Sequence, residues 1–255
     1  MLAGKFGLIC NVANHRSAAW SIAKACDAAG ARLAICYRGD REQENLVKLA
    51  AELSRPPLIV PCDVTSDEQL AALGEQLTAE FGRLDFLVHA LAFAKIEDLQ
   101  GRFLDTSRDG FRLAHDVSAY SLAALTHAVE SLLHEGSSVV TLTYIAALRT
   151  VPHYNVMGVA KASLEATVRY LAADLGPKGI RVNAISAGPM RTLAAAAIGQ
   201  FKAMYGLYAD HVPLRRNTTQ EEVADATLFL VSHLSRGITG DVIYVDNGFH
   251  ILGAQ

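Results

Sequence analysis

The feature that most constrains the fold is a regular alternation of short apolar runs with longer helix-forming segments. The runs predict strands over residues 7–13, 31–38, 57–64, 84–91, 137–144, 179–186 and 240–248. The other segments predict helices over 18–29, 42–53, 67–81, 108–133, 155–175, 193–208 and 220–230. Continuous apolar strands separated by helices indicate parallel strands that are buried on both faces. We therefore expect an α/β fold with a doubly wound, parallel, seven-stranded sheet and helices on both faces.

The chain of 255 residues contains no repeat and no linker rich in Pro, Gly or Ser, so we expect one domain over 1–255. A net charge of -3 gives no electrostatic case for binding nucleic acid or an anionic membrane. The N-terminus lacks the pattern of a secretory signal, and no apolar run approaches the ~20 residues of a membrane span. The default is a soluble cytoplasmic protein.

The four cysteines are Cys10, Cys26, Cys36 and Cys62, all in apolar stretches without a CxxC pair or companion histidines. This pattern favours small buried side chains in a reducing compartment over a disulfide framework or a metal site. We expect no metal centre.

Ligands of doubly wound sheets bind at the carboxyl ends of the strands, near the point where the strand order reverses. The positions that follow the predicted strands are therefore the first candidates for a site. They are residues 11–17, 37–40, 63–64, 90–95, 144 and 187–192.

The first strand-to-helix turn, residues 11–23, is a weak signal for a dinucleotide site. Such a site favours glycines, which let the backbone approach a pyrophosphate at a helix N-terminus, and this turn has none. Asn11, Asn14 and Ser17 can adopt tight or capping conformations, and Ala13 and Ala18 are small.

Two polar residues after the second predicted strand bear on cofactor choice. Arg38 can accommodate a ribose 2′-phosphate, whereas an acidic residue such as Asp40 can bind the 2′-hydroxyl. The choice between NADPH and NADH stays open. Asp63, after the third strand, can bond an adenine amino group or cap a turn, and neither alternative is favoured.

Residues 144–161 hold two tyrosines and a lysine at a spacing that suits carbonyl and nicotinamide chemistry. Tyr154 lies seven residues before Lys161, and Tyr144 lies ten residues earlier still. On a helix, seven residues span two turns and ~10 Å. That separation suits two ends of a flat ligand, and the alternative is a surface tyrosine and a solvated lysine.

Residues 142–195, 201–207 and 240–249 closely resemble the enoyl-acyl-carrier-protein reductases of bacterial type II fatty acid synthesis. Residues 115–121 also resemble a helix of this group, a divergent branch of the short-chain dehydrogenase/reductase family. In ordinary members of that family a tyrosine lies four residues before the lysine, but here that position is Met157. A tyrosine seven residues before the lysine is typical of the enoyl reductases.

The resemblance implies a Rossmann-like NADH- or NADPH-dependent enoyl thioester reductase with Tyr144, Tyr154 and Lys161 as catalytic residues. Tyr154 would bond the thioester carbonyl and Lys161 the ribose hydroxyls of the nicotinamide. The predicted cofactor contacts are Asn11, Ala13, Ser17, Ala18, Arg38, Asp63, Val64, Ala90, Leu91, Ala92, Lys161, Pro189, Met190 and Thr192. The predicted substrate contacts are Ala94, Tyr144, Tyr154, Met157, Phe201 and Met204.

The resemblance also implies a homotetramer, an acyl carrier protein or coenzyme A as acyl donor, and a substrate-covering helical segment at about 193–210. Three positions depart from the family pattern. Asn11 replaces a usual glycine, and asparagine tolerates positive φ better than most residues. Ala92 replaces the glycine of Ser-x-Gly and narrows the space beside the nicotinamide. Lys202 is nearly the only basic residue of the covering segment.

Two other functions stay open at this point. One is a paralogous reductase of the same fold that acts on a carbonyl or another activated alkene. The other is a cofactor-binding subunit with low activity, which the altered turn at Asn11 and the segment 90–92 would suit.

Overall fold

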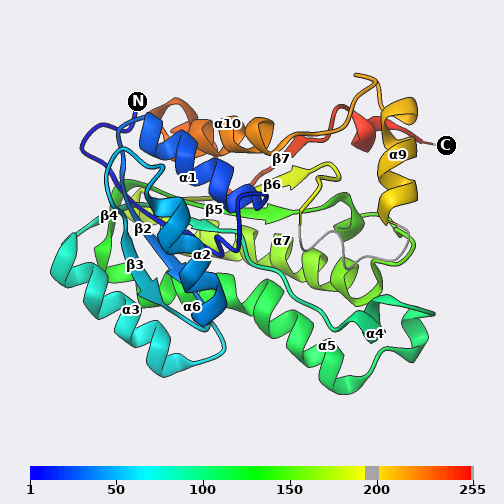
Figure 1. The fold of residues 1–255 in the computed structure, drawn as a ribbon, viewed down its shortest axis with the longest axis horizontal. Helices are drawn as coiled ribbons and strands as arrows, with labels where there is room; N and C mark the ends of the chain where they lie inside the picture. The colour runs from blue at the N-terminus through cyan, green and yellow to red at the C-terminus, as the bar shows by residue number, and fades with distance from the viewer. Residues whose placement is uncertain (193–200, 254–255) are drawn as a thin grey trace.

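The structure is a computed structural model that describes residues 1–192 and 201–253. Of residues 201–204 it describes the backbone alone. One parallel sheet runs through the described chain in the order β3-β2-β1-β4-β5-β6-β7 (Figure 1). Its strands are β1 (Phe6–Cys10), β2 (Arg32–Tyr37), β3 (Leu58–Pro61), β4 (Leu84–His89), β5 (Leu133–Thr143), β6 (Arg181–Ala187) and β7 (Val242–Val245). The predicted doubly wound, seven-stranded parallel sheet is confirmed.

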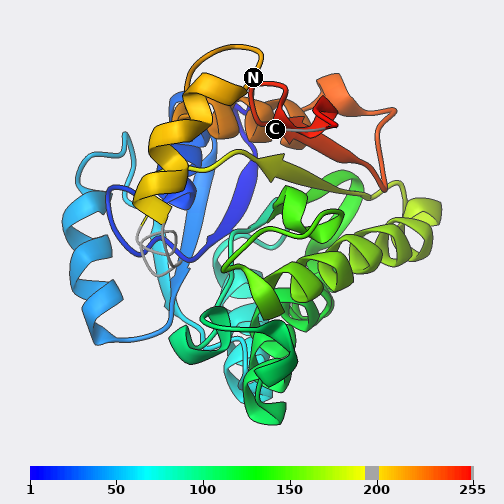
Figure 2. The same ribbon diagram turned by 90° about the vertical axis from the view of Figure 1, so that its right-hand side faces the viewer.

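Helices cover both faces of the sheet (Figures 1 and 2). One face carries α1 (Ala18–Ala28), α2 (Asp40–Ala50) and α10 (Gln220–Val231). The other carries α3 (Asp67–Glu80), α5 (Arg108–His115), α6 (Ser121–Ala128) and α7 (Asn155–Leu175). Two further helices, α4 (Ile96–Leu99) and α9 (Phe201–His211), lie beyond the carboxyl ends of the strands. Short helical turns span Phe103–Asp105, Glu130–Leu132, Ile145–Ala147, Gly176–Lys178, His233–Ser235 and Phe249–Ile251.

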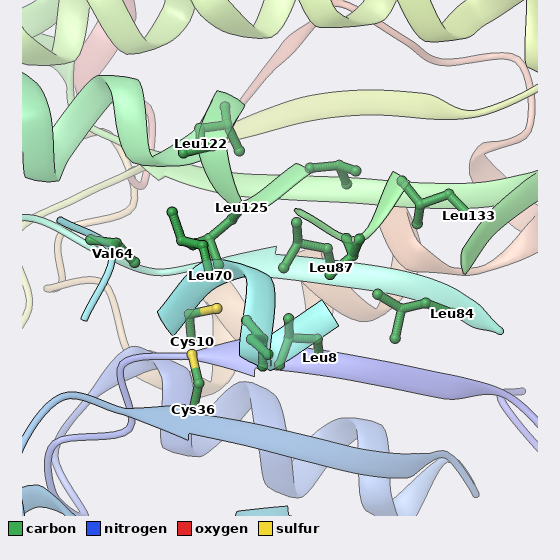
Figure 3. Close-up of a cluster of buried hydrophobic side chains, with 14 of the residues drawn as sticks. Leu8, Cys10, Cys36, Val64, Leu70, Leu84, Leu87, Leu122, Leu125 and Leu133 are labelled. Carbon is green, nitrogen blue, oxygen red and sulfur yellow. The ribbon is translucent and has the colours of Figure 1, made fainter. Parts of the chain in front are cut away.

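The sheet separates two hydrophobic clusters, because successive side chains of each strand point to opposite faces. In the cluster of Figure 3, Leu8 and Leu87 of the strands pack against Leu70 of α3 and Leu125 of α6. These continuous apolar strands are buried on both faces, as the alternation in the sequence predicts.

The helix predicted over 108–133 is the main error of the sequence analysis. The structure divides it into α5, the π-helical turn η2 (Asp116–Tyr120) and α6, and β5 begins at Leu133. Periodicity alone does not reveal a π-helical turn, which inserts an extra residue into an otherwise regular helix. Such turns are frequent at functional sites, and this one lies under the candidate site described below.

All four cysteines are buried free thiols, as the sequence predicts. Burial raises the pKa of Cys26 to about 12. The sulfur atoms of Cys10 and Cys36, which are register partners in β1 and β2, lie close together in the core (Figure 3). Among the helices of the described residues, none combines the length and apolarity needed to cross a membrane.

Candidate active site

The turn after β1 has the backbone shape that a glycine would supply. Asn11 adopts a φ of 70°, in the left-handed region. Its side-chain Nδ2 donates to the Ala90 carbonyl at 2.9 Å, so it joins this turn to the end of β4. The structure therefore brings together two of the segments predicted to contact a cofactor.

The N-terminus of α1 fits an anionic group. Ser17 is the N-cap residue, but its side chain makes no capping hydrogen bond and instead donates to the Asn14 carbonyl at 2.7 Å. The backbone amides of the first helical turn, which begins at Ala18, thus have no side-chain cap. Helix N-termini bind phosphate through such amides and through the helix dipole. Ala13 is half-buried beside this turn, and Asn45 of α2 donates to its carbonyl at 3.3 Å.

Arg38 lies at the end of β2, with its guanidinium carbon 6.0 Å from the ring centroid of Phe93, which follows β4. Asp63 accepts hydrogen bonds from the backbone amide and the hydroxyl of Thr65 through Oδ1, at 3.0 and 2.8 Å. This is the turn-capping arrangement that the sequence left as one alternative. Val64 is buried in the core beside it.

The two tyrosines lie together at the carboxyl end of β5. The ring of Tyr144, which follows β5, lies with its centroid 5.0 Å from that of Tyr154, at an interplanar angle of 60°. Tyr154 is the N-cap residue of α7, and Lys161 lies within the same helix. Lys161 is only 4% exposed and both tyrosines are half-buried. The alternative of a surface tyrosine and a solvated lysine is therefore wrong.

Burial moves the pKa of both phenols further above neutral pH. It raises the pKa of Tyr144 to about 12, with a further contribution from the nearby charge of Asp246. It also raises the pKa of Tyr154, and Tyr144 adds to that effect. A protonated phenol can donate a hydrogen bond to a carbonyl oxygen.

The backbone on either side of Tyr154 is strained. His153 has a φ of 61° and Asn155 a φ of 33°, in the left-handed region that residues other than glycine rarely adopt. Asn155 Nδ2 donates to the Gly101 carbonyl at 3.3 Å. Such outliers gather at functional sites and persist where the surrounding structure imposes them.

Lys161 is held by the end of β5. Its Nζ donates to the Leu142 carbonyl at 2.8 Å. Burial lowers the pKa of Lys161 to about 8, and the charge of Glu165, one helical turn further along α7, opposes that shift. Burial also raises the pKa of Glu165, against the hydrogen bond from Thr143 and the charges of Arg169 and Lys161. Desolvation thus outweighs attraction for both groups.

His89, the last residue of β4, is a fully buried neutral imidazole. The Ser121 hydroxyl donates to the Val117 carbonyl at 2.7 Å and therefore accepts from Nε2 of His89 at 2.8 Å. Nδ1 lies 2.8 Å from the Thr141 hydroxyl, which also lies 3.2 Å from the His89 carbonyl. Burial, with a smaller effect from the charge of Lys161, lowers the pKa of His89 to about 3.

The π-helical turn η2 braces the loop after β4. Ser118 Oγ accepts from the backbone amide of Phe93 at 2.9 Å and lies 3.1 Å from the Phe93 carbonyl. It also lies 3.7 Å from the sulfur of Met157 in α7. The single serine of η2 therefore reaches both the loop and α7.

Three of the predicted substrate contacts, Ala94, Tyr154 and Met157, lie in one small apolar cluster, together with the predicted cofactor contact Ala92. Ala92, Ala94 and Tyr154 pack against the buried Met157 and its neighbours Leu99, Ala114 and Val156. Leu91 packs instead against the core under α3 and α6, and Ala90 against the core on the α1 face. The side chains of Phe201 and Met204 lie outside the described residues.

The loop after β6 closes over the same edge of the sheet. Pro189 is buried, Met190 packs against the α1 face of the core, and the Thr192 amide donates to the Met190 carbonyl at 2.9 Å. Gln220, at the start of α10, donates to the carbonyls of Arg191 and Arg16 at 3.4 and 3.3 Å. Gln220 thereby joins this loop to the turn after β1.

Sequence reasoning missed the buried polar residues that support the tyrosines and the lysine. They are His89, Ser118, Ser121, Thr143 and Glu165. A polar residue within an apolar strand, or a carboxylate four residues after a buried lysine, was the available signal. Their partners come from other elements, so the interactions themselves are not readable from sequence.

Tyr154 and Lys161 lie at the start of α7 and within it, and the turn after β1 leads into a helix N-terminus without a side-chain cap. Both lie toward the carboxyl ends of the strands, where doubly wound α/β proteins bind dinucleotides. The family model described as "Enoyl-(Acyl carrier protein) reductase" matches residues 12–250. The chain belongs to this family.

The relatives agree over the full length of the chain. The NADH-dependent enoyl-[acyl-carrier-protein] reductase of Bacillus cereus is 51% identical over 254 residues, which cover 99% of both chains. The NADPH-dependent reductase of Staphylococcus aureus is 47% identical over 252 residues, 98% of both chains. The crystal structure of the Bacillus cereus enoyl-acyl carrier protein reductase with NADP+ and indole naphthyridinone superposes with a TM-score of 0.97, at 51% identity and 99% coverage of both chains.

Proposed function

We propose that this protein is an enoyl-acyl-carrier-protein reductase, which reduces the trans-2 double bond of enoyl thioesters with NADH or NADPH. The observation that carries the proposal is the contact between the rings of Tyr144 and Tyr154, beside a buried lysine on the same helix. Relatives that bear this activity in their names match the chain from end to end.

In the proposed reaction Tyr154 stabilises the charge that develops on the thioester oxygen. Addition of hydride to the β-carbon moves an electron pair toward the carbonyl, and protonation of the α-carbon completes the saturated product. The phenol of Tyr154 is protonated at neutral pH, since burial only raises its pKa, so it can donate a hydrogen bond to the enolate oxygen. Tyr144 then limits the space beside the substrate and shields the phenol of Tyr154 from water.

The cofactor supplies the hydride when it is bound. We propose that the amides at the start of α1, with Asn11, Ala13, Ser17 and Ala18, hold its pyrophosphate. Lys161 would hold the nicotinamide ribose. The remaining contacts would come from Arg38, Asp63, Val64, Ala90, Leu91, Ala92, Pro189, Met190 and Thr192.

For the acyl donor we propose a thioester of acyl carrier protein, with coenzyme A thioesters as the comparison. The names of the relatives support the carrier protein. Lys202, nearly the only basic residue of the covering segment, argues for weak docking of an acidic partner. Turnover of the same enoyl chain on the two carriers decides between them.

We also propose a cytoplasmic homotetramer. Four buried thiols without a disulfide suit a reducing compartment. Exposed apolar side chains on η2 and the helices beside it suit packing against further copies of the chain, and they are Phe111, Tyr120, Val159 and Tyr170. A monomeric mass by light scattering at micromolar concentration would contradict the tetramer.

The test is a matrix of NADH and NADPH against enoyl-carrier-protein, enoyl-coenzyme A and a 3-oxoacyl thioester, followed by oxidation of the reduced cofactor. We expect turnover of the enoyl thioesters and its loss in Tyr154→Phe and in Lys161→Ala. Full activity of both variants would contradict the proposal. Turnover of ketones with inertness toward enoyl thioesters would favour a carbonyl reductase, and failure to bind either cofactor in calorimetry would favour a low-activity subunit.

A further inference from the structure

The last two residues of β5 are both bonded to α7. The Leu142 carbonyl accepts from Lys161 Nζ, and the Thr143 hydroxyl donates to Glu165 Oε1, each at 2.8 Å. Thr143 directly precedes Tyr144, and Glu165 lies four residues beyond Lys161, on the same face of α7. These two hydrogen bonds therefore join the strand that leads into Tyr144 to the helix that begins after Tyr154.

The Thr143–Glu165 bond lies in the interior of the protein. Thr143 is 4% exposed and Glu165 is 6% exposed. Burial of a carboxyl group is unfavourable, and a well-packed apolar residue at such a position is often neutral or stabilising. The stability of this part of the core therefore does not explain the glutamate. A role in the neighbouring site does.

The position of the bond suits the control of ring geometry. α7 is a continuous helix of 21 residues, so a contact at Glu165 is transmitted along a stiff element to Tyr154 at its start. The other end of the contact is one residue from Tyr144. Loss of the bond would remove one of the two hydrogen bonds that hold the end of β5 against α7, and we expect it to change the 5.0 Å separation of the two rings.

We propose that Thr143 and Glu165 are a positioning pair for the reductase reaction, whose hydrogen bond holds Tyr144 in place against Tyr154 and beside Lys161. The inference rests on the proposed function. In this proposal neither residue touches the reacting atoms. Thr143 acts through Tyr144, which follows it, and Glu165 acts through α7, which begins after Tyr154.

The carboxylate of Glu165 has a second effect, on the charge of Lys161. Two ionisable groups interact with the charge of the lysine: Glu165, one turn further along α7, and His89, the last residue of β4. The phenols of the same site belong to Tyr154, the N-cap residue of α7, and to Tyr144, after β5. His89 is neutral and the two phenols stay protonated, so Glu165 supplies the charge that opposes the burial of the ammonium. Its removal would lower the pKa of Lys161 further, because desolvation would then act with less opposition.

Thr143→Val tests the positioning, because it keeps the shape of the side chain and removes only the hydroxyl. We expect kcat on an enoyl thioester to fall between about tenfold and a hundredfold. The dissociation constant of the cofactor should stay within about threefold, since the bonds at α1 and at Lys161 are untouched. Thr143→Ser, which restores the hydroxyl, should recover most of the lost kcat.

The matched control is Thr227→Val, which removes another buried threonine hydroxyl. Thr227 lies in α10, on the opposite face of the sheet, where its hydroxyl donates to the Val223 carbonyl at 2.7 Å. This variant should keep the wild-type kcat. If Thr143→Val also keeps it, or loses no more than Thr227→Val, the positioning pair is overturned.

Glu165→Gln tests the electrostatic effect, because the amide oxygen can still accept from Thr143 but carries no charge. Cofactor affinity, measured by calorimetry from pH 6 to 10, should begin to fall at a lower pH than in the wild type. Identical pH profiles would overturn this role of Glu165. A wild-type chain that reduces no enoyl thioester would overturn the proposed function itself, whereas an active wild type with an unaffected Thr143→Val overturns the pair alone.

Discussion

The turn after β1 and the tyrosines after β5 lie at the same edge of the sheet, but they depend on the sequence in different ways. The turn consists of backbone in a particular shape, and Asn11 supplies that shape with a φ of 70° where the family resemblance implies a glycine. The tyrosine end consists of buried side chains whose pKa values are shifted by their surroundings. Several residue types can satisfy a backbone requirement, whereas a phenol or an ammonium has no substitute. The comparison explains why the sequence departs from the family pattern at the turn and keeps it at the tyrosines.

Tyr154→Phe should give the largest effect, because it removes the hydroxyl that we propose to donate a hydrogen bond to the developing charge. We expect kcat to fall by roughly 10² to 10³, as for other donors of this kind. The ring contact with Tyr144 is preserved, so the dissociation constant of the cofactor should stay near that of the wild type. Stopped-flow measurement of hydride transfer checks the first point and calorimetry the second. A fall in kcat of less than about threefold would contradict the comparison, because the phenol would then be replaceable, as the residue in the turn is.

The buried ammonium of Lys161 should lower the stability of the protein at neutral pH. Its pKa falls from 10.5 to about 8 on folding, so between these values the unfolded chain binds more protons and stability rises with pH. The rise is on the order of 3 kcal/mol. We therefore expect the free energy of unfolding of the wild type, relative to that of Lys161→Met, to increase from pH 8 to pH 10.5. Urea unfolding of both proteins across this range measures the difference. Both proteins carry the same tyrosines, so the ionisation of phenols cancels, and a constant difference would contradict the prediction.

The substitutions Asn11→Gly and Asn11→Ala separate the backbone of the turn from its side chain. Glycine adopts the φ of 70° without strain and loses only the hydrogen bond to Ala90, so cofactor affinity should fall by about 1 kcal/mol or less. Alanine loses the hydrogen bond and also strains the backbone, at a further cost of about 1–2 kcal/mol in the free energy of unfolding. Thermal unfolding with and without cofactor distinguishes the two variants. If Asn11→Gly and Asn11→Ala lower the unfolding temperature equally, the backbone conformation at residue 11 is not what the turn requires.

The two regions also differ in how far they could be predicted from sequence. Strand ends follow from the alternation of apolar runs and helices, so Asn11, Arg38 and Tyr144 could be assigned to one edge of a parallel sheet. The φ of Asn11 was only allowed by its residue type, and its bond to Ala90 depends on how β1 and β4 pair. The supporting bonds of the tyrosine end were not predicted at all. Thr143–Glu165 and His89–Ser121 join residues that are distant in sequence, and they meet because of the way helices cross the sheet.

Ala92→Gly should give the smallest effect and tests the boundary between the two regions. Ala92 packs in the cluster with Ala94, Met157 and Tyr154. From the family resemblance we expect its methyl group to narrow the space beside the proposed nicotinamide site. Removal of one methyl group should strengthen binding of a compact aromatic inhibitor that stacks on the cofactor by about 1 kcal/mol. It should also lower the free energy of unfolding by ~0.5–1 kcal/mol, because glycine loses more conformational freedom on folding. Inhibition constants measured at saturating cofactor check the first effect, and the dissociation constant of the cofactor alone is the control. Unchanged inhibition would mean that the loop after β4 moves aside for the inhibitor, despite the bonds from Ser118 that brace it.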